Sequence, residues 1–510
     1  MSIRKKVIFN AGSNWMSQFI NAVIVLVFIR IIPRSLGWES YGVWALLATG
    51  LRYPMILENA FSLTTNRFAA FYHNDREQLN RFVSASFIIL FSIALLTIAA
   101  AIFLSFFVSD IFTAITNDLA FEAQITCILV GVTLALRIVE AAFNGTLMGF
   151  QYHTRYNSIT SATNILRIIL IITMLKYWKS IIALQLAFVI TASVSLATVI
   201  YVTRKSIPGL TIELSKVNGK TIREIFRYSS HAAARSGSMI FMYSTLALLI
   251  GKVGTAENVS VYDIASRISG FINSLLAGAH NVFLPTITNL FAEGQTEKIK
   301  SVIKKGTNIS AVITCTILIM LFMYAKNILV LLLRDMFLPE MLPVLLVMLI
   351  SIVPRGFFGI WIPSLAGIGH LREMTIAAIA AVISAIALEI VLLSGLVAVP
   401  MAPAIAQTIA LWGYIGLWLP FYGVSKCGLS LYKYLRDGLL GSLKASVISA
   451  AVLLLINLFA HQYYISWVLM FILSGLIVSI CFTIISLRNE SRWILNVIKS
   501  KLGCHSETSI

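Results

Sequence analysis

Charged residues are scarce in this chain. Only 12% of its 510 residues are Asp, Glu, Lys or Arg, whereas 58% are hydrophobic. Soluble domains carry roughly twice that share of charge, so the composition excludes an ordinary soluble protein. Apolar runs of about 18 residues or more, each able to cross a hydrocarbon core about 30 Å thick as a helix, recur along the chain. Backbone polar groups in lipid must be satisfied within their own segment, so we expect an all-α, polytopic membrane protein.

The sequence also lacks the usual signs of an enzyme or a metal site. Its five cysteines are scattered, without a C-x-x-C pair or a histidine at metal-ligand spacing: Cys127, Cys315, Cys427, Cys481 and Cys504. It contains neither a P-loop nor paired carboxylates on a shared aqueous face. The longest aqueous segment, about 25 residues, is too short for a catalytic domain. We therefore expect no catalytic residue, no metal and no cofactor, and a membrane-embedded polysaccharide polymerase is left as an alternative.

The basic start, Arg4 to Lys6, precedes an apolar stretch with no small-residue cleavage site, so we expect this stretch to be retained as the first span. Apolar runs between charged breaks predict about 14 transmembrane helices in all. Their approximate limits are 7–30, 41–63, 82–108, 123–148, 158–175, 181–203, 229–250, 258–285, 306–324, 341–366, 374–395, 403–424, 445–461 and 466–487.

Acidic residues are outnumbered by basic ones, 21 against 39. Most Lys and Arg fall in alternate loops on the side of the N-terminus, so the positive-inside rule predicts that both termini face the cytoplasm. The net charge of +18 then reflects membrane topology, and binding to nucleic acid is not needed to explain it. Basic loops such as 204–227 are suited to anionic lipid headgroups, and Trp493, Ile494, Val497 and Ile498 predict an amphipathic cytoplasmic tail.

Weak internal similarity recurs at an offset of about 220 residues. Tyr41 pairs with Tyr262, Phe71 with Phe291, and the segment 147–150 with 365–368. This pattern predicts two pseudo-symmetric six-helix lobes, at 1–205 (helices 1–6) and 206–424 (helices 7–12). Two additional transmembrane helices and the tail follow at 425–510. Chance similarity between helices of like composition is the alternative.

Ten charged residues lie well inside the predicted spans, away from their ends. They are Arg52, Arg137, Arg167, Arg235, Arg267 and Arg355, with Glu58, Glu140, Asp263 and Glu389. Each arginine facing lipid at the bilayer centre costs roughly 2.5 to 3.5 kcal/mol, so these residues are expected to face the bundle interior or a hydrated cavity. Arg137 with Glu140, and Asp263 with Arg267, can pair along one helix. The four acids are candidates for ion coupling, with charge compensation for the arginines as the alternative.

Arg52, Arg235 and Arg355 have no acid three or four residues away. Arg52 precedes Pro54, and Arg355 follows Pro354, so each lies where a helix is expected to kink. The guanidinium group is a planar, permanently charged fork of donors suited to phosphate. We therefore assign these three, with Arg267 and Arg137, to substrate binding.

The first span adds a polar stripe of Asn10, Asn14, Gln18 and Asn21, which share one helix face. Hydrogen bonding between helices would explain such a stripe. We favour a cavity lining, because four amides along one face could contact sugar hydroxyls.

Several short segments resemble a known family. They are Asn10-Ala11-Gly12-Ser13 after the basic start, Leu36-Gly37-x3-Tyr41-Gly42-x-Trp44, Gly149-Phe150-Gln151-x4-Tyr156-Asn157 and Tyr262-x-Ile264-Ala265-x-Arg267-Ile268. In order and spacing the chain is similar to the O-antigen and capsule type polysaccharide flippases of the multidrug, oligosaccharidyl-lipid and polysaccharide exporter superfamily. The resemblance covers nearly the whole chain.

The resemblance implies a two-lobed fold with a central cationic cavity. It further implies transport of polyprenyl-pyrophosphate-linked oligosaccharide units to the periplasmic leaflet by alternating access, for surface polysaccharide such as O-antigen or capsule. Membrane lipids and other polysaccharide-pathway membrane proteins are the further partners it suggests. The alternatives are a peptidoglycan lipid-precursor flippase, a cation-coupled drug exporter and a channel. The first span lacks the acid that drug exporters of this superfamily often use.

Overall fold

The computed structural model describes residues 20, 24–50, 52–213, 215, 217–462, 474 and 475, with the backbone alone at 50, 231, 232, 234–236 and 456–462. In these ranges the chain forms helices joined by turns and short loops, with no strand. The predicted all-α fold is confirmed.

The described residues divide into two compact units. The first comprises those up to Arg267, together with Leu332–Val344 and Ala378–Ala406. The second comprises Ile268–Leu331, Leu345–Ala377 and those from Gln407 onward. This division by contacts does not test the proposed repeat, so the lobes 1–205 and 206–424 and the tail 425–510 stay a prediction.

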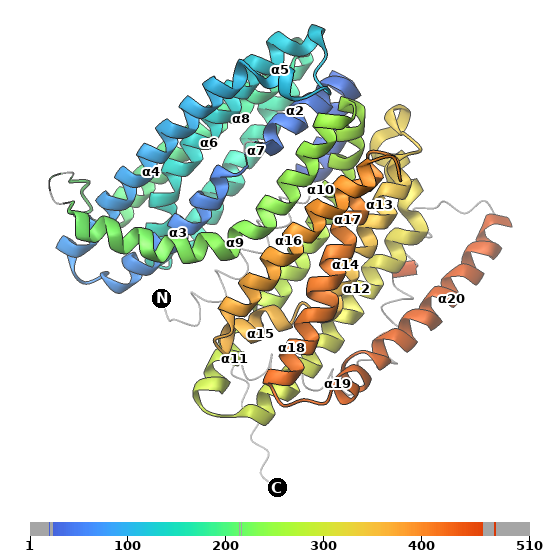
Figure 1. Cartoon of the computed structure of the whole chain (residues 1–510). Helices are drawn as coiled ribbons and strands as arrows, with labels where there is room; N and C mark the ends of the chain where they lie inside the picture. Colours follow the sequence, from blue (N-terminus) through green and yellow to red (C-terminus); the bar gives the residue numbers. More distant parts are fainter. Residues whose placement is uncertain are drawn as a thin grey trace. The chain divides into compact units, whose positions relative to one another are not determined.

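The first unit begins with a helix over residues 24–36. Its other main helices are α2 (Trp38–Gly50), α3 (Pro54–Phe71), α4 (Arg76–Ser105), α6 (Ala120–Gly149), α7 (His153–Tyr177), α8 (Ile181–Ser206), α9 (Gly219–Val253) and the first part of α10 (Ala256–Asn281). The short helices α5 (Val108–Ile111) and η1 (Asn117–Leu119) join α4 to α6. In Figure 1, α4, α6 and α8 run together as a layer of long helices.

Helix α6 is the centre of this unit. It packs against α3, α4 and α8, and 67% of its spanning window is buried, against 28% for α4. The core between them includes Phe61, Phe82, Leu90, Ile138 and Phe143. Because the outer face of α4 exposes large apolar side chains, that face is suited to contact lipid rather than water.

Polar caps explain where three of these helices begin. The side chain of Asp75 accepts a hydrogen bond from the Gln78 N–H at 3.1 Å before α4. Ser180 does the same for Ile182 at 3.1 Å before α8, and Asn218 for Thr221 at 2.8 Å before α9. Each cap satisfies a backbone N–H that the helix itself leaves without an acceptor.

Two predicted spans are interrupted near the expected prolines. The span predicted at 41–63 is divided between α2 and α3, with Arg52 in the turn just before Pro54. The span predicted at 341–366 is divided into α13 (Met341–Ile350), α14 (Ile352–Phe358) and α15 (Trp361–Gly367). Pro354 and Arg355 lie inside α14, so the interruptions fall on either side of them and the kink predicted at Arg355 stays a prediction.

The remaining helices are α11 (Phe283–Ala292), α12 (Thr296–Leu333), η3 (Arg334–Met336), α16 (Leu371–Leu393), α17 (Met401–Leu411), the π-helical η4 (Trp412–Trp418), α18 (Leu419–Lys426), α19 (Leu431–Gly438) and α20 (Leu440–Gln462). In the second unit α15 packs against α11 and α18. Val312, Cys315, Met320 and Tyr324 of α12 form a cluster with residues of α20.

Eight helices in the described residues are long and apolar enough to span a membrane, or nine if the bent pair α19 and α20 is one span. The chain is therefore a multi-pass membrane protein. Most of the first candidate span, 7–30, and all but two residues of the last, 466–487, lie outside the described residues. Each candidate range between them falls on helix, while the total of 14 stays a prediction.

Candidate functional site

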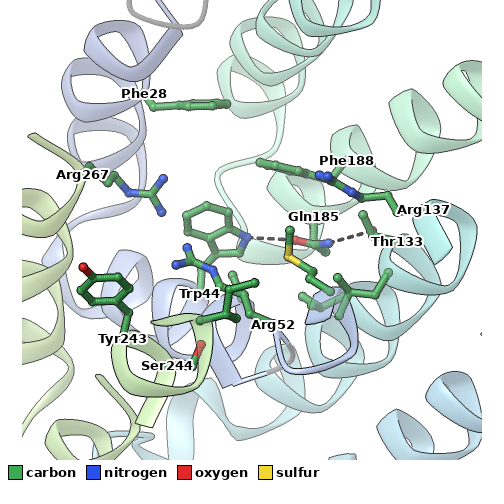
Figure 2. Close-up of a pocket in the computed structure, with 15 residues that line it drawn as sticks. Phe28, Trp44, Arg52, Thr133, Arg137, Gln185, Phe188, Tyr243, Ser244 and Arg267 are labelled. Atoms are coloured by element: carbon green, nitrogen blue, oxygen red, sulfur yellow. Dashed lines mark hydrogen bonds between the residues drawn. The ribbon is translucent and has the colours of Figure 1, made fainter. Parts of the chain in front are cut away.

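A cavity of about 410 Å³ lies inside the first unit, and three of the predicted arginines line it. Its wall is made by the helix at 24–36, the turn at Arg52 and helices α2, α3, α6, α8, α9 and α10. The polar and aromatic lining residues are Phe28, Trp44, Arg52, Thr133, Arg137, Gln185, Phe188, Tyr243, Ser244 and Arg267 (Figure 2). No Asp or Glu is among the lining residues described, so the cavity surface is cationic.

Arg52 is positioned by the break between α2 and α3. Its backbone N–H donates to the Thr49 carbonyl at 3.1 Å, which closes the turn ahead of Pro54. Within the described part of the chain, its guanidinium group has no ion pair and no hydrogen bond. The sequence pattern already predicted an arginine without a local acid, and the structure adds that no acid among the described residues forms an ion pair with it.

Arg267 is held by a buried polar cluster. Its Nε donates to Asp263 Oδ2 at 2.5 Å and lies 3.2 Å from the Tyr41 hydroxyl. The Tyr41 hydroxyl donates to the same carboxylate oxygen. Tyr41 and Asp263 are both buried. The predicted pairing of Asp263 with Arg267 along α10 is confirmed, and Tyr41 ties this pair to α2.

An aromatic and amide wall separates the arginines. The Arg267 guanidinium carbon lies 5.5 Å from the centre of the Trp44 ring, within cation–π range. The Trp44 Nε1–H donates to Gln185 Oε1 at 3.0 Å, and Gln185 Nε2 donates to Thr133 at 2.9 Å. Figure 2 shows this chain of bonds as dashed lines, with Arg137 near Phe188. The indole and the amide are thus held in fixed orientations at the cavity surface.

A second cavity of about 330 Å³ lies beside the first and shares Thr133, Arg137 and Phe188 with it. Its lining is far more polar and includes both acids predicted on α3 and α6: Glu58, Glu140, Asn144, Tyr156, Thr160, Thr163, Asn164, Arg167 and Ser195. Arg137 Nη2 lies 3.4 Å from Glu58 Oε1. The second oxygen of Glu58 is buried without a hydrogen-bond partner in the described residues.

The predicted pairing of Arg137 with Glu140 is wrong. Arg137 reaches across to Glu58 on α3, whereas Glu140 accepts from Asn144 at 3.2 Å and from Ser195 at 2.9 Å. Glu140 is therefore satisfied by two neutral donors. The local spacing allowed one pair, but the contact between α3 and α6 supplied a different partner.

Arg167 is the further intramembrane arginine of this cavity. Its Nε donates to the Thr191 hydroxyl at 3.1 Å, and its guanidinium carbon lies 5.0 Å from the centre of the Phe188 ring. Phe188 lines both cavities. The expectation that intramembrane arginines face a cavity is met by Arg52, Arg137, Arg167 and Arg267.

Other predicted site residues lie elsewhere. Arg355 is half-buried on α14 in the second unit and lines neither of the two cavities described above. Glu389 is fully buried on α16, and neither of its carboxylate oxygens has a hydrogen-bond partner among the described residues. The side chain of Arg235 on α9 and the whole stripe of Asn10, Asn14, Gln18 and Asn21 lie outside the described residues, so their assignments stay predictions.

Sequence reasoning missed several lining residues. Trp44 was noted only as part of a motif, and Gln185, Thr133, Phe188 and Tyr243 were not singled out. Gln185 carried a usable signal, because it is an amide inside the apolar run 181–203 and such residues seek partners on neighbouring helices. Phe188 and Thr133 gave no such signal, since phenylalanine and threonine are both common within membrane spans.

The first cavity combines three kinds of group. Guanidinium donors bind phosphate oxygens, an aromatic face offers apolar contact for a sugar ring or lipid chain, and the amide and hydroxyls exchange hydrogen bonds with hydroxyl groups. This set fits an anionic, hydroxylated ligand.

Comparisons with known proteins agree with this chemistry. A family model described as polysaccharide biosynthesis protein matches residues 31–341. A putative O-antigen transporter from Salmonella typhi is 23% identical over 302 residues, which are 58% of this chain and 67% of that protein.

Solved structures share the fold. The lipid II flippase MurJ in an inward closed conformation is similar with a TM-score of 0.71 and 17% identity, covering 94% of this chain and 99% of that one. An inward-facing multidrug resistance MATE family transporter of the MOP superfamily is similar with a TM-score of 0.66 and 15% identity, covering 82% and 96%. At these identities the likeness concerns the fold alone. Because the family model spans more than half of the chain, the protein belongs to the polysaccharide biosynthesis protein family, on a fold shared with MOP-superfamily transporters.

Proposed function

We propose that this protein is a flippase for polyprenyl-pyrophosphate-linked oligosaccharide repeat units. It moves them from the cytoplasmic to the periplasmic leaflet of a bacterial inner membrane by alternating access, for surface polysaccharide such as O-antigen or capsule. The observation that best supports this proposal is the cationic cavity lined by Arg52, Arg137 and Arg267. The cavity lies inside a membrane-embedded unit, and none of its described lining residues is an acid. Membership of the family and the likeness to a putative O-antigen transporter support the substrate class.

The physical problem for such a substrate is dehydration. A pyrophosphate and several sugars must pass a hydrocarbon layer that offers them no hydrogen bonds. In the first cavity, Arg52 supplies a cation that no described acid neutralises, Trp44 offers a flat apolar face, and Gln185 and Ser244 offer polar contacts. We assign the pyrophosphate to Arg52, Arg137 and Arg267, and the proximal sugar to the wall formed by Trp44 and Gln185.

We propose further that the protein is not an enzyme, that both termini are cytoplasmic, and that membrane lipids and other polysaccharide-pathway membrane proteins are its partners, with no nucleic acid among them. Ion coupling, if transport is driven uphill, is assigned to Glu58, Glu140, Asp263 or Glu389. Of these, Glu58 and Glu389 have buried carboxylate oxygens without a partner in the described residues. Transport at an unchanged rate after collapse of each ion gradient would exclude such coupling.

The test is flipping of lipid-linked repeat units in proteoliposomes. We expect Arg52→Ala to lower the initial rate at least tenfold, because one desolvated charge contact of about 1.4 kcal/mol corresponds to a factor of ten. We expect a loss in the same direction for Arg355→Ala, on the sequence argument that assigned it to the substrate. The control is Arg34→Ala, which removes one positive charge from a side chain that is 57% exposed outside both cavities. Wild-type rates in both test variants would refute the assignment.

A peptidoglycan lipid-precursor flippase is the second candidate, favoured by the fold likeness to the lipid II flippase. Both substrates carry pyrophosphate, so the arginines do not separate them. The two candidates are separated by supplying lipid II to the same proteoliposomes. Flipping of lipid II but not of lipid-linked repeat units would favour this second candidate.

A further inference from the structure

Arg137 lies in the wall between the two cavities and faces both of them. Its side chain keeps 41% of its exposure, whereas that of Glu58 keeps 15%. The guanidinium group is therefore open to a ligand on one side while it is paired on the other. This arrangement makes Arg137 the one cation of the first cavity that is bound to an acid of the second.

The contact between Arg137 and Glu58 is a weak one for its kind. It is a single approach of 3.4 Å, whereas strong guanidinium–carboxylate pairs are bidentate at roughly 2.7 to 2.9 Å. No other hydrogen bond or ion pair of Arg137 is found in the described residues. Arg137 thus keeps several N–H donors for a denser anion, such as pyrophosphate.

The two acids of the second cavity depend on Arg137 to different degrees. Glu140 accepts from Asn144 and Ser195 and stays satisfied without a cation. Glu58 has Arg137 alone, and its second oxygen has no partner among the described residues. The other titratable groups lining this cavity are Tyr156 and Arg167 on α7, and Arg167 is engaged by Thr191 and Phe188.

We propose that Glu58 is an internal counter-ion, which the anionic headgroup of the substrate displaces from Arg137. The proposal rests on the flippase function. Glu58 and the headgroup compete for one guanidinium group, so the contact with Glu58 compensates the charge of Arg137 while the cavity is empty and weakens binding of the headgroup.

In Glu58→Gln the side chain carries no charge and no longer competes for Arg137. The variant should therefore bind the headgroup more tightly than wild type.

The experiment measures binding of inorganic pyrophosphate and of farnesyl pyrophosphate to the full-length protein in detergent, by calorimetry at neutral pH. We expect Glu58→Gln to bind about tenfold more tightly than wild type, since close charge pairs couple by at least 1.4 kcal/mol, a factor of ten. We expect Glu140→Gln, which removes the same charge from the same cavity, to change the affinity far less.

A double-mutant cycle completes the test. In an Arg137→Gln background, Glu58→Gln should leave the affinity unchanged, because the cation for which Glu58 competes is gone. Glu58→Asp, whose side chain is one methylene shorter, should show a smaller gain in affinity. This variant replaces Glu58→Gln in the test if Glu58→Gln does not fold. The counter-ion role would be overturned if Glu140→Gln raised the affinity as much as Glu58→Gln. It would also be overturned if neither Glu58→Gln nor Glu58→Asp raised the affinity while Arg52→Ala still weakened binding. Absence of binding to wild type, or unchanged binding in Arg52→Ala, would instead refute the pyrophosphate site itself.

Discussion

At the scale of single residues, the cavity arginines offset the cost of burial in three ways. Arg267 has an acid on its own helix, Arg137 has one on a neighbouring helix, and Arg52 has none among the described residues. The sequence predicted the first case, because an i, i+4 spacing is read along one helix. It could not predict the second, since Glu58 and Arg137 are 79 positions apart and meet only once α3 is packed against α6.

Removing the acid of the first pair should destabilise the protein. Asp263→Asn leaves Arg267 as a mostly buried cation without its partner and weakens the hydrogen bond from Tyr41. We expect a loss of roughly 3 to 5 kcal/mol, the range measured when one member of a buried pair is removed. The measurement is the thermal unfolding midpoint in detergent, followed by intrinsic fluorescence.

The matched control is Glu297→Gln. Glu297 also pairs with a cation near it in sequence, Lys300 at 2.7 Å, but its side chain is 85% exposed. Exposed pairs contribute about 0 to 1 kcal/mol, so the midpoint should hardly move. Equal midpoints for Asp263→Asn and wild type would mean that this cluster does not brace α2 against α10.

At the scale of helices, the motif Leu36-Gly37-x3-Tyr41-Gly42-x-Trp44 has a physical explanation. Gly37 ends the helix at 24–36 with a φ of +81°, which disfavours residues with a side chain. Tyr41 binds Asp263, Gly42 allows the backbone of α10 to approach, and Trp44 faces the cavity. The resemblance to the family was thus carried by residues that position the site, although their roles could not be read from their order.

Gly42 gives a prediction about the contact of α2 with α10. A Cβ added there would lie 1.9 Å from the carbonyl oxygen of Ala256 and 2.8 Å from the Ser260 hydroxyl. Gly42→Ala therefore forces the two backbones apart and should cost about 1 to 3 kcal/mol as overpacking. We expect a lower unfolding midpoint and a lower transport rate, because Trp44 and Arg267 would shift together.

Gly219→Ala is the control for this change. Gly219 begins α9, and a Cβ added there would have no other atom within 4 Å among the described residues. Alanine is the better helix former by roughly 1 kcal/mol, so this variant should be as stable as wild type or slightly more so. A Gly42→Ala protein that unfolds and transports like Gly219→Ala would show that the close approach is unimportant.

At the scale of the whole chain, composition and periodicity predicted the helices well and the cavities poorly. Spans, proline breaks and intramembrane arginines follow from local patterns that any lipid-embedded helix must obey. The wall formed by Trp44, Gln185 and Thr133 needs the rotation of α2, α6 and α8 about their axes. No residue of one helix reports how a neighbouring helix is turned, so this part of the site required coordinates.

Loops predicted to share a side of the membrane make contacts in the structure. The Thr113 hydroxyl donates to the Lys252 carbonyl at 2.9 Å, and both lie on the predicted periplasmic side. Asn80 donates to the Gly209 carbonyl at 3.0 Å on the predicted cytoplasmic side. These contacts agree with the alternation of spans in the first unit, while the direction of the first span rests on the distribution of Lys and Arg.

Cysteine labelling of intact cells tests that direction. In a variant with all five native cysteines replaced, Asn117→Cys between α5 and α6 should react with a membrane-impermeant maleimide added outside. Asn74→Cys between α3 and α4 should react only after the membrane is opened, because its loop adjoins the basic segments held in the cytoplasm. Both positions are exposed, so accessibility within the protein is matched. The opposite pattern would reverse the orientation of the chain in the membrane.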